Sequence, residues 1–182
     1  MKMKSSLFWI LVFSALVLVS GCQPVSIYTQ RATATAYSAE YMTTAMQAAE
    51  DGAMALCNID FEAKAAGYIQ QVCDASTQLG CEFFTSQIDQ AWNDLERATS
   101  SDVLECTPAT SRFLDEGEQF GMRVQYWQVN LQGTKGWSAS SNDREYWLQV
   151  AEENSNWKLN RVLTSDEVAY YLAIDSMSGE DQ

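Results

Sequence analysis

Cysteine carries the clearest chemistry in this chain, and histidine is absent from it. Without an imidazole, neither a catalytic triad with a histidine base nor a histidine-ligated zinc site can form. Four of the five cysteines lie within the body of the chain: Cys57, Cys73, Cys81 and Cys106. If the chain is exported, an even number predicts two disulfides with three possible connectivities. Buried free thiols and a four-thiolate zinc site are the alternatives, but no two of these cysteines form a C-x-x-C pair.

Acid–base chemistry in a chain without histidine would fall to tyrosine, carboxylates, lysine or cysteine. Four such residues could face a common interior: Tyr68, Tyr126, Glu105 and Asp102. Burial raises the pKa of a carboxyl, and a tyrosine beside it could then share a proton. No spacing singles these residues out, and buried tyrosines usually complete a core. We therefore predict no catalytic residue, no metal ion and no cofactor.

The N-terminus combines positive charge, an apolar run and a cysteine. Two lysines precede the apolar run 7–19. A membrane-spanning helix needs roughly 20 apolar residues, whereas the core of an export signal has about 7–15. The run ends in Val19-Ser20-Gly21-Cys22, which resembles the lipobox of bacterial lipoproteins. The resemblance implies cleavage before Cys22, acylation of its sulfur and anchoring in the cell membrane or outer membrane. An ordinary cleaved signal peptide, or an uncleaved anchor, is the alternative.

Composition and pattern divide the chain into four segments. We predict a signal peptide over residues 1–21, a flexible tether rich in small and hydroxylic residues over 22–37, one folded domain over 38–174 and a polar tail over 175–182. The length of the third segment suits a single domain with its own core.

The charge of the chain limits its partners. The sequence has 11 basic and 24 acidic residues and a net charge of -13. Nucleic acids and anionic lipid surfaces need a basic footprint, so we predict that neither is a partner. The acids are dispersed, which suits solubility outside the membrane and would also suit a cationic partner.

Hydrophobic periodicity predicts helices first and strands afterwards. Apolar residues recur at helical spacing over 38–57, 60–75 and 82–98, with Asp60 as an N-cap and a break at 77–80. The period then changes to two, which predicts strands over 103–111, 119–132, 144–152 and 157–163. We expect a hairpin turn at 153–156 and a closing helix over 166–173, capped by Ser165 or Thr164.

The strand over 119–132 changes its alternation midway. Phe120, Met122, Val124 and Tyr126 share one face, whereas Trp127, Val129 and Leu131 share the other. A bulge near Tyr126-Trp127 would realign the two faces and bend the strand, so we expect a curved sheet.

These elements predict an α+β fold in which N-terminal helices pack on a curved antiparallel sheet of about four strands. The final strand, Trp157-Lys158-Leu159-Asn160-Arg161-Val162-Leu163, and the strand over 146–151 resemble the end of the NTF2-like (cystatin-like α+β cone) fold. The resemblance covers residues 53–173 and implies helices in the concave face of a bent sheet. It also implies two kinds of relative: periplasmic assembly domains of type IV secretion systems, and enzymes such as ketosteroid isomerases. No catalytic residue of those enzymes has a matching position here.

We therefore predict a non-catalytic, lipid-anchored binding or assembly module of the bacterial cell envelope, facing the periplasm or the exterior. Its partners would be the membrane, through the lipid on Cys22, and an envelope protein or a small-molecule ligand. Trp137 lies in a glycine-flanked polar loop and is the candidate contact residue, because tryptophan is enriched among interface hot spots. Alternatively, Trp137 folds back over the sheet edge. The alternative function is a small-molecule-binding enzyme with a tyrosine and a carboxylate in the cone.

Overall fold

The computed structural model describes residues 39–99, 101–136 and 143–178. The predicted signal peptide, the predicted tether, Cys22 and Trp137 lie outside the described residues. Their roles therefore stay predictions.

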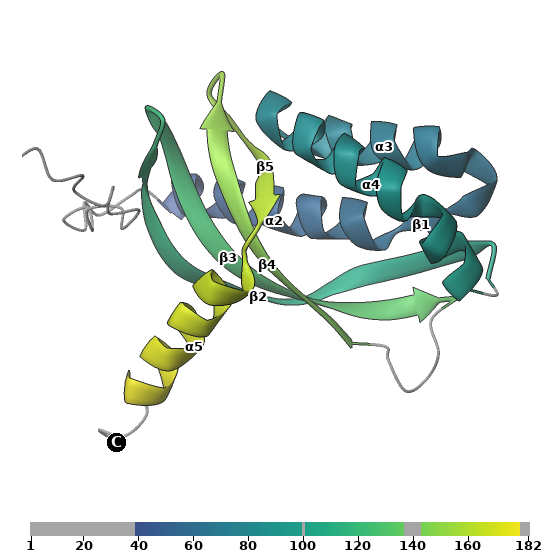
Figure 1. Ribbon diagram of the computed structural model, residues 1–182. Coiled ribbons are helices and arrows are strands. Elements are labelled where there is room, and N and C mark those ends of the chain that lie inside the picture. Colours follow the sequence, from purple (N-terminus) through teal and green to yellow (C-terminus); the bar gives the residue numbers. More distant parts are fainter. Residues whose placement is uncertain (1–38, 100, 137–142, 179–182) are drawn as a thin grey trace, which may run out of the picture.

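Within the described residues, a five-stranded antiparallel sheet curves around three helices, and a further helix lies on its other face (Figure 1). The helical elements are α2 (Ala39–Cys57), η1 (Phe61–Ala63), α3 (Lys64–Ala75), α4 (Gln78–Ala98) and α5 (Ser165–Ser178). The strands are β1 (Ile59–Asp60), β2 (Val103–Gln119), β3 (Met122–Lys135), β4 (Asp143–Glu153) and β5 (Asn156–Val162). They are hydrogen-bonded in chain order, from β1 to β5. This arrangement confirms the predicted α+β fold.

The sheet has five strands rather than about four, because a two-residue strand follows α2. The backbone of Asp60 pairs with Val103, while its side chain accepts a 2.9 Å hydrogen bond from the backbone N–H of Glu62. Asp60 is therefore a helix cap, as predicted, and a strand residue as well. A two-residue strand has no alternation that a sequence pattern could detect.

Helix α2 lies inside the curve of the sheet and contacts every strand from β2 to β5. Its buried side chains are small: Ala45, Ala48, Ala49, Ala53, Ala55 and Cys57. At Gly52 a Cβ atom would lie 2.9 Å from the Cβ of Leu159. Glycine is therefore required where α2 approaches β5 most closely.

Helix α4 begins earlier than predicted. We expected a break over 77–80, but α4 starts at Gln78 because Thr77 is its N-cap and accepts a 3.0 Å hydrogen bond from the N–H of Gly80. Gly80 is a helical residue here for a packing reason: a Cβ atom would lie 2.8 Å from the carbonyl oxygen of Asn160. From the sequence, Gly80 resembled a helix breaker. In the fold, its missing side chain allows the backbone of β5 to approach α4 closely.

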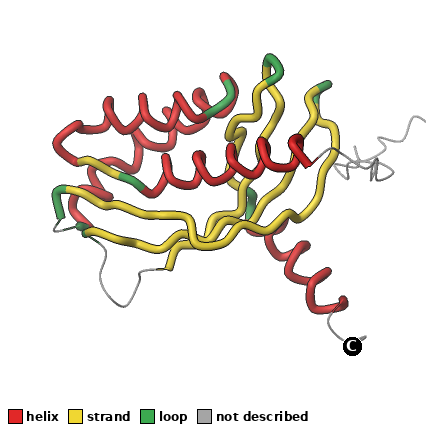
Figure 2. Tube along the Cα trace, turned by 180° about the vertical axis from the view of Figure 1, so that it is seen from behind, coloured by secondary structure: helices red, strands yellow, loops and turns green. Residues whose placement is uncertain are grey.

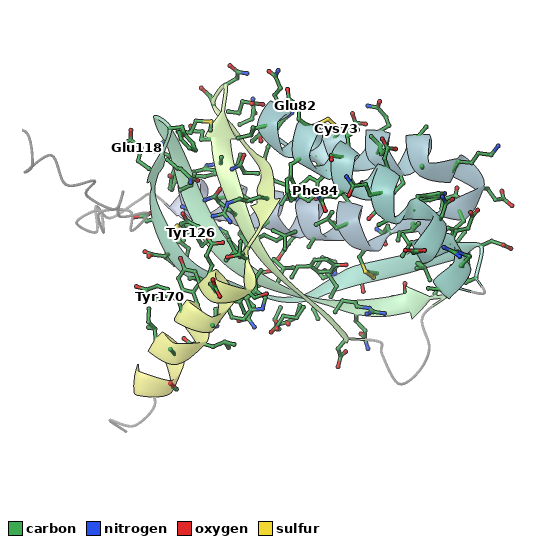
Figure 3. The ribbon with its side chains drawn as sticks, in the orientation of Figure 1. Cys73, Glu82, Phe84, Glu118, Tyr126 and Tyr170 are labelled. Atoms are coloured by element: carbon green, nitrogen blue, oxygen red, sulfur yellow. A yellow bond between two sulfur atoms is a disulfide. The ribbon has the colours of Figure 1, made fainter. Side chains whose placement is uncertain are left out.

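The four body cysteines form two disulfides, which confirms the prediction and selects one connectivity. Cys57 pairs with Cys106 and joins the end of α2 to β2. Cys73 pairs with Cys81 and joins α3 to α4; Figure 3 labels Cys73 on the helical pair. One bridge therefore holds a helix to the sheet and the other holds two helices together.

Strand β2 runs to Gln119, whereas the prediction ended it at Ser111. Phe120 and Gly121, both with positive φ (52° and 76°), form the turn to β3. The second half of β2 has polar residues on both faces, so no alternation marked it as a strand. The predicted strand over 119–132 therefore began inside this turn.

The prediction of a bulge in the strand of Tyr126 and Trp127 was wrong. Strand β3 pairs with β4 in unbroken register there, and the irregularity lies opposite, in β2, between Phe113 and Asp115. The alternation changes because the sheet is covered on both faces at this point. Trp127 faces the helices α2 to α4, and Tyr126 faces α5.

The apolar core is accordingly divided by the sheet. We call the face toward α2, α3 and α4 the inner face and the face toward α5 the outer face (Figure 2). The inner cluster contains large buried residues, among them Tyr68, Phe84, Trp92, Trp127, Leu131, Leu148 and Leu159. The outer cluster consists of Val124, Tyr126, Trp147, Ala151 and Leu163, with Leu114, Val168 and Tyr171 partly buried against it.

Candidate protein-interaction site on helix α5

Helix α5 begins with a reciprocal cap. The hydroxyl of Thr164 accepts from the backbone N–H of Glu167 at 3.4 Å, and the carboxylate of Glu167 accepts from the backbone N–H of Thr164 at 2.8 Å. This is the capping-box arrangement, in which two backbone donors of the first turn are satisfied together. Thr164 is therefore the cap, one of the two residues predicted. The helix continues to Ser178 instead of ending at Ala173, into the segment predicted as a polar tail.

The same carboxylate is held by the sheet. Two nitrogens of Arg161, on β5, donate to the two carboxylate oxygens of Glu167 at 2.7 and 2.6 Å. These bonds are the main reason that the pKa of Glu167 is lowered to about 2. The pKa of Arg161 is raised, also mainly by its bond to Glu167. A bidentate guanidinium–carboxylate pair fixes orientation as well as distance. The first turn of α5 is thus aligned on the end of β5.

Arg161 belongs to a polar network buried within the sheet. The side-chain oxygen of Gln149 accepts from Asn160 at 2.7 Å and from Arg161 at 3.2 Å. The nitrogen of Gln149 donates to Gln119 and to the hydroxyl of Tyr126, both at 3.0 Å. Gln149 is fully buried, and such a group is costly unless it is hydrogen-bonded. The network satisfies Gln149 and joins four strands, from β2 to β5.

The network also passes through the sheet. Asn160 is the extra residue in β5, since Gln149 pairs with Arg161 and Val150 pairs with Leu159. Its side-chain oxygen accepts a 2.8 Å bond from the hydroxyl of Thr77, the N-cap of α4. One chain of hydrogen bonds therefore connects the start of α4, on the inner face, with the start of α5, on the outer face.

Beyond its first turn, α5 rests on a narrow contact. Val168 and Tyr171 pack on the outer cluster, and near the far end Asp175 accepts a 2.5 Å bond from Arg112 of β2. Three other large apolar side chains of α5 are exposed: Tyr170 by 49%, Leu172 by 51% and Ile174 by 39%. We call these three residues the α5 patch. Figure 3 shows Tyr170 on the opposite side of the sheet from Phe84.

The α5 patch was not among the predicted site residues. The sequence contains a signal for it, since Val168 is followed by six further apolar residues up to Ile174. An amphipathic helix on a sheet has an apolar stripe on one side only. An unbroken apolar run places large side chains all round the helix, and a single contact with the sheet cannot cover them.

The tyrosines and carboxylates that could have formed a catalytic pair lie apart. Tyr68 is on the inner face and donates a 2.6 Å bond to the carbonyl of Leu56. Tyr126 is on the outer face, and burial raises the pKa of both hydroxyls. Glu105 is exposed beside Lys135, and Asp102 is exposed immediately before β2. The structure does not bring these four residues together.

Two further observations concern the described residues only. No helix among them is long and apolar enough to cross a membrane. Within the same residues no group of three or more cysteine, aspartate or glutamate side chains is arranged to hold a metal ion.

Comparisons with known proteins find two solved structures of similar shape. The periplasmic domain of DotI aligns with a TM-score of 0.49 and 15% identity, over 71% of this chain and 96% of that one. A periplasmic fragment of TraM aligns with a TM-score of 0.44 and 15% identity, over 71% of this chain and 97% of that one. No protein-family model matches the sequence, and no curated protein matches it either.

Proposed function

We propose that this protein is a non-catalytic assembly module of the bacterial cell envelope, anchored by a lipid on Cys22 and bound to a protein partner through the α5 patch. The proposal rests on one observation: α5 is held on the sheet by ion pairs near both ends, while large apolar side chains of the same helix are exposed. The helix is fixed by the Glu167–Arg161 pair at its start and by Asp175–Arg112 near its end.

The two disulfides support a location outside the cytoplasm. Disulfides persist in oxidising compartments such as the periplasm and are rare where thiols are kept reduced. Both bridges join secondary-structure elements of the folded body, as expected of structural disulfides in an exported protein. The lipobox-like Val19-Ser20-Gly21-Cys22 supplies the corresponding export and anchoring signal.

The α5 patch supports a protein partner. Tyr170 and Ile174 are four residues apart on one side of the helix, and Leu172 is exposed on another side. Interface cores are enriched in aromatic and other large apolar side chains. Removing apolar surface from water is favourable. Burial of these side chains against a partner would therefore contribute roughly 25 cal/mol for each Å² of apolar surface covered. A helix with a preset orientation also loses little conformational freedom on binding.

The proposal is tested by a triple variant, Tyr170→Ser, Leu172→Ser and Ile174→Ser, in the full chain. The matched control is Leu79→Ser with Phe83→Ser, which removes two exposed apolar side chains from α4. Both variants are expected to keep the circular dichroism spectrum and the melting temperature of the parent. Only the α5 variant should shift the detergent-solubilised protein from a larger assembly to its own size in size-exclusion chromatography. An unchanged elution of the α5 variant would contradict the proposal.

The anchor is tested separately with Cys22→Ser. The substituted chain should leave the membrane fraction and appear in the soluble fraction. It should also lose the mass of the attached lipid in mass spectrometry. Retention in the membrane without a change in mass would contradict lipidation at Cys22 and leave the α5 test unaffected.

A further inference from the structure

The turn between β2 and β3 contains a residue that does not suit its backbone. Gln119 pairs with Met122, so Phe120 and Gly121 alone form the turn, with φ values of 52° and 76°. Two-residue hairpin turns with two positive φ values favour Asn-Gly or Asp-Gly, because these residues tolerate that backbone conformation. A bulky phenylalanine at the first position therefore strains the turn rather than helping to form it.

The side chain of Phe120 does not contribute to the core either. It is 85% exposed, the largest exposed fraction among the large apolar side chains of the described residues. A Cβ atom at Gly121 would meet nothing within 4 Å, so the turn lies in open space. Single exposed apolar residues are common on protein surfaces. One that also strains its backbone indicates a contact outside the domain, since such strain persists mainly where function requires it.

This turn lies at the end of the domain where α2 begins. In Figures 1 and 2 the β2–β3 and β4–β5 hairpins both end on that side. The guanidinium carbon of Arg123, on β3, lies 4.7 Å from the ring centroid of Tyr41 in the first turn of α2. Arg123 also forms an ion pair with Glu152 near the end of β4. The rings of Tyr41 and Trp157, on β5, have centroids 5.1 Å apart. These contacts hold the two hairpins beside the start of α2.

The proposed lipid anchor attaches to the chain at the same end. Only residues 23–38 separate Cys22 from Ala39, the first residue of α2. A flexible chain of this length, as predicted for the tether, has a root-mean-square end-to-end distance of roughly 20–25 Å. A bilayer that holds the lipid of Cys22 would therefore lie close to the end of the domain that carries Phe120.

We propose that Phe120 inserts into the surface of the bilayer that carries the anchor and thereby orients the domain on the membrane. This inference rests on the anchor of the proposed function. One phenylalanine is too weak to hold a protein on a membrane, but an anchor gives the side chain a high effective concentration at the surface. Tyr41 and Trp157 are half-buried at the same end, and tyrosine and tryptophan are enriched at membrane–water interfaces.

The charge of this end determines which lipids suit it. Glu118 is exposed two residues before Phe120, and Figure 3 shows it on the outermost strand, away from α3 and α4. A carboxylate beside the inserted side chain is repelled by anionic headgroups. The contact therefore fits a zwitterionic lipid surface, and anionic lipid should weaken it.

The contact is tested with Phe120→Trp in the full chain. The protein is reconstituted into vesicles of phosphatidylcholine with brominated acyl chains, which quench tryptophan fluorescence on contact. The parent, with its six tryptophans, gives the background. The control is Ala98→Trp, at the exposed end of α4, because Ala98 precedes the start of β2 and Phe120 follows its end. Only the fluorescence added by Phe120→Trp should be quenched, and adding phosphatidylglycerol should reduce the quenching.

Phe120→Asn tests whether the phenylalanine is maintained for this contact. Asparagine tolerates a positive φ, so the variant should melt at a slightly higher temperature than the parent. Unbrominated phosphatidylcholine vesicles should slow hydrogen exchange in the β2–β3 turn of the parent but not in that of the variant. A lower melting temperature of the variant would show that Phe120 supports the fold, and would overturn the proposal.

Flotation with the vesicles distinguishes failure of the contact from failure of the anchor. Absence of quenching in a Phe120→Trp chain that floats with the vesicles would overturn this inference alone. Equal quenching in both tryptophan variants would also overturn it, because the domain would then have no preferred orientation. Loss of the larger assembly in Phe120→Asn, without quenching in Phe120→Trp, would identify a protein partner at the turn instead. A parent chain that does not float would overturn the anchor and this inference together, and would leave the α5 test unaffected.

Discussion

The two faces of the sheet are built in different ways. The inner face is covered by α2, α3 and α4, holds the larger apolar cluster and carries both disulfides. The outer face is covered by α5 alone, over a small cluster. There the helix is aligned by polar contacts, chiefly the pair of Arg161 and Glu167. Burial of apolar area supplies most of the folding free energy, so the stability of the domain should depend mainly on the inner face. The orientation of α5 should depend mainly on the contacts of the outer face.

The largest expected effect concerns the Cys57–Cys106 disulfide. It spans 49 residues, whereas Cys73–Cys81 spans 8. In the chain-entropy description the long bridge contributes about 4 kcal/mol and the short one about 2.5 kcal/mol to the free energy of unfolding. Replacing each pair by alanine and measuring urea unfolding should reproduce this order. A greater loss for the short bridge would show that loop entropy does not govern the inner face.

The second prediction compares one leucine on each face. Leu148 is completely buried in the inner cluster, and Leu163 is nearly so in the outer one. Leu148→Ala should lower the free energy of unfolding by about 3–4 kcal/mol, and Leu163→Ala by about 2 kcal/mol, the low end for such substitutions.

Hydrogen exchange sharpens this comparison. Leu148→Ala should accelerate exchange throughout the sheet and helices, because the inner cluster joins them all. Leu163→Ala should accelerate it mainly in α5. Equal acceleration in both variants would mean that the two clusters unfold as one unit.

The third prediction concerns the polar anchor of α5. Glu167→Gln removes the ion pair with Arg161 and weakens the cap on Thr164. We expect a loss of about 1–2 kcal/mol, confined to local opening of α5. Asp166→Asn is the control, since it removes an exposed acid from the same helical turn and should cost less than about 1 kcal/mol. If the control opened α5 as much, the helix dipole rather than Arg161 would hold it.

The sequence predicted the elements whose apolar residues face one side. The three inner helices follow from their helical spacing, and the prediction of two disulfides followed from the even number of cysteines in the body of the chain. The prediction from sequence failed where a residue's local pattern differs from its role in tertiary packing. Gly80 resembles a helix breaker but admits the backbone of β5. Tyr126 and Trp127 suggested a bulge, although the regular strand is simply buried on both faces.

The candidate site was less predictable than the fold. Asn160 and Thr77 are joined by a hydrogen bond across 83 residues of sequence, and no local pattern can indicate such a pair. The acidic end of β2 has no apolar alternation, so the second half of this strand was missed. These positions are occupied by charged and hydrogen-bonding side chains. Hydrophobic periodicity detects only faces that bury apolar residues, so it cannot indicate such positions.

The smallest expected effect is the pH dependence of the α5 anchor. The pKa of Glu167 is lowered from 4.5 to about 2 in the folded protein. A lowered carboxyl pKa stabilises the folded state above the unfolded value, and this contribution is lost as the pH falls through the folded value. Docking of α5 should therefore weaken between about pH 4.5 and pH 2, since Arg161 then faces a neutral acid.

The NMR signals of Val168 and Tyr171 report this change, because both side chains lie in the contact of α5 with the sheet. In the parent their shifts should move over that pH range. In Glu167→Gln they should already resemble the acidic state at neutral pH and change little on acidification. The inner face supplies an internal reference, since Trp127 and Leu148 should not respond. A parallel response of the inner residues would mean that acid loosens the whole domain, and the two faces would then not be independent.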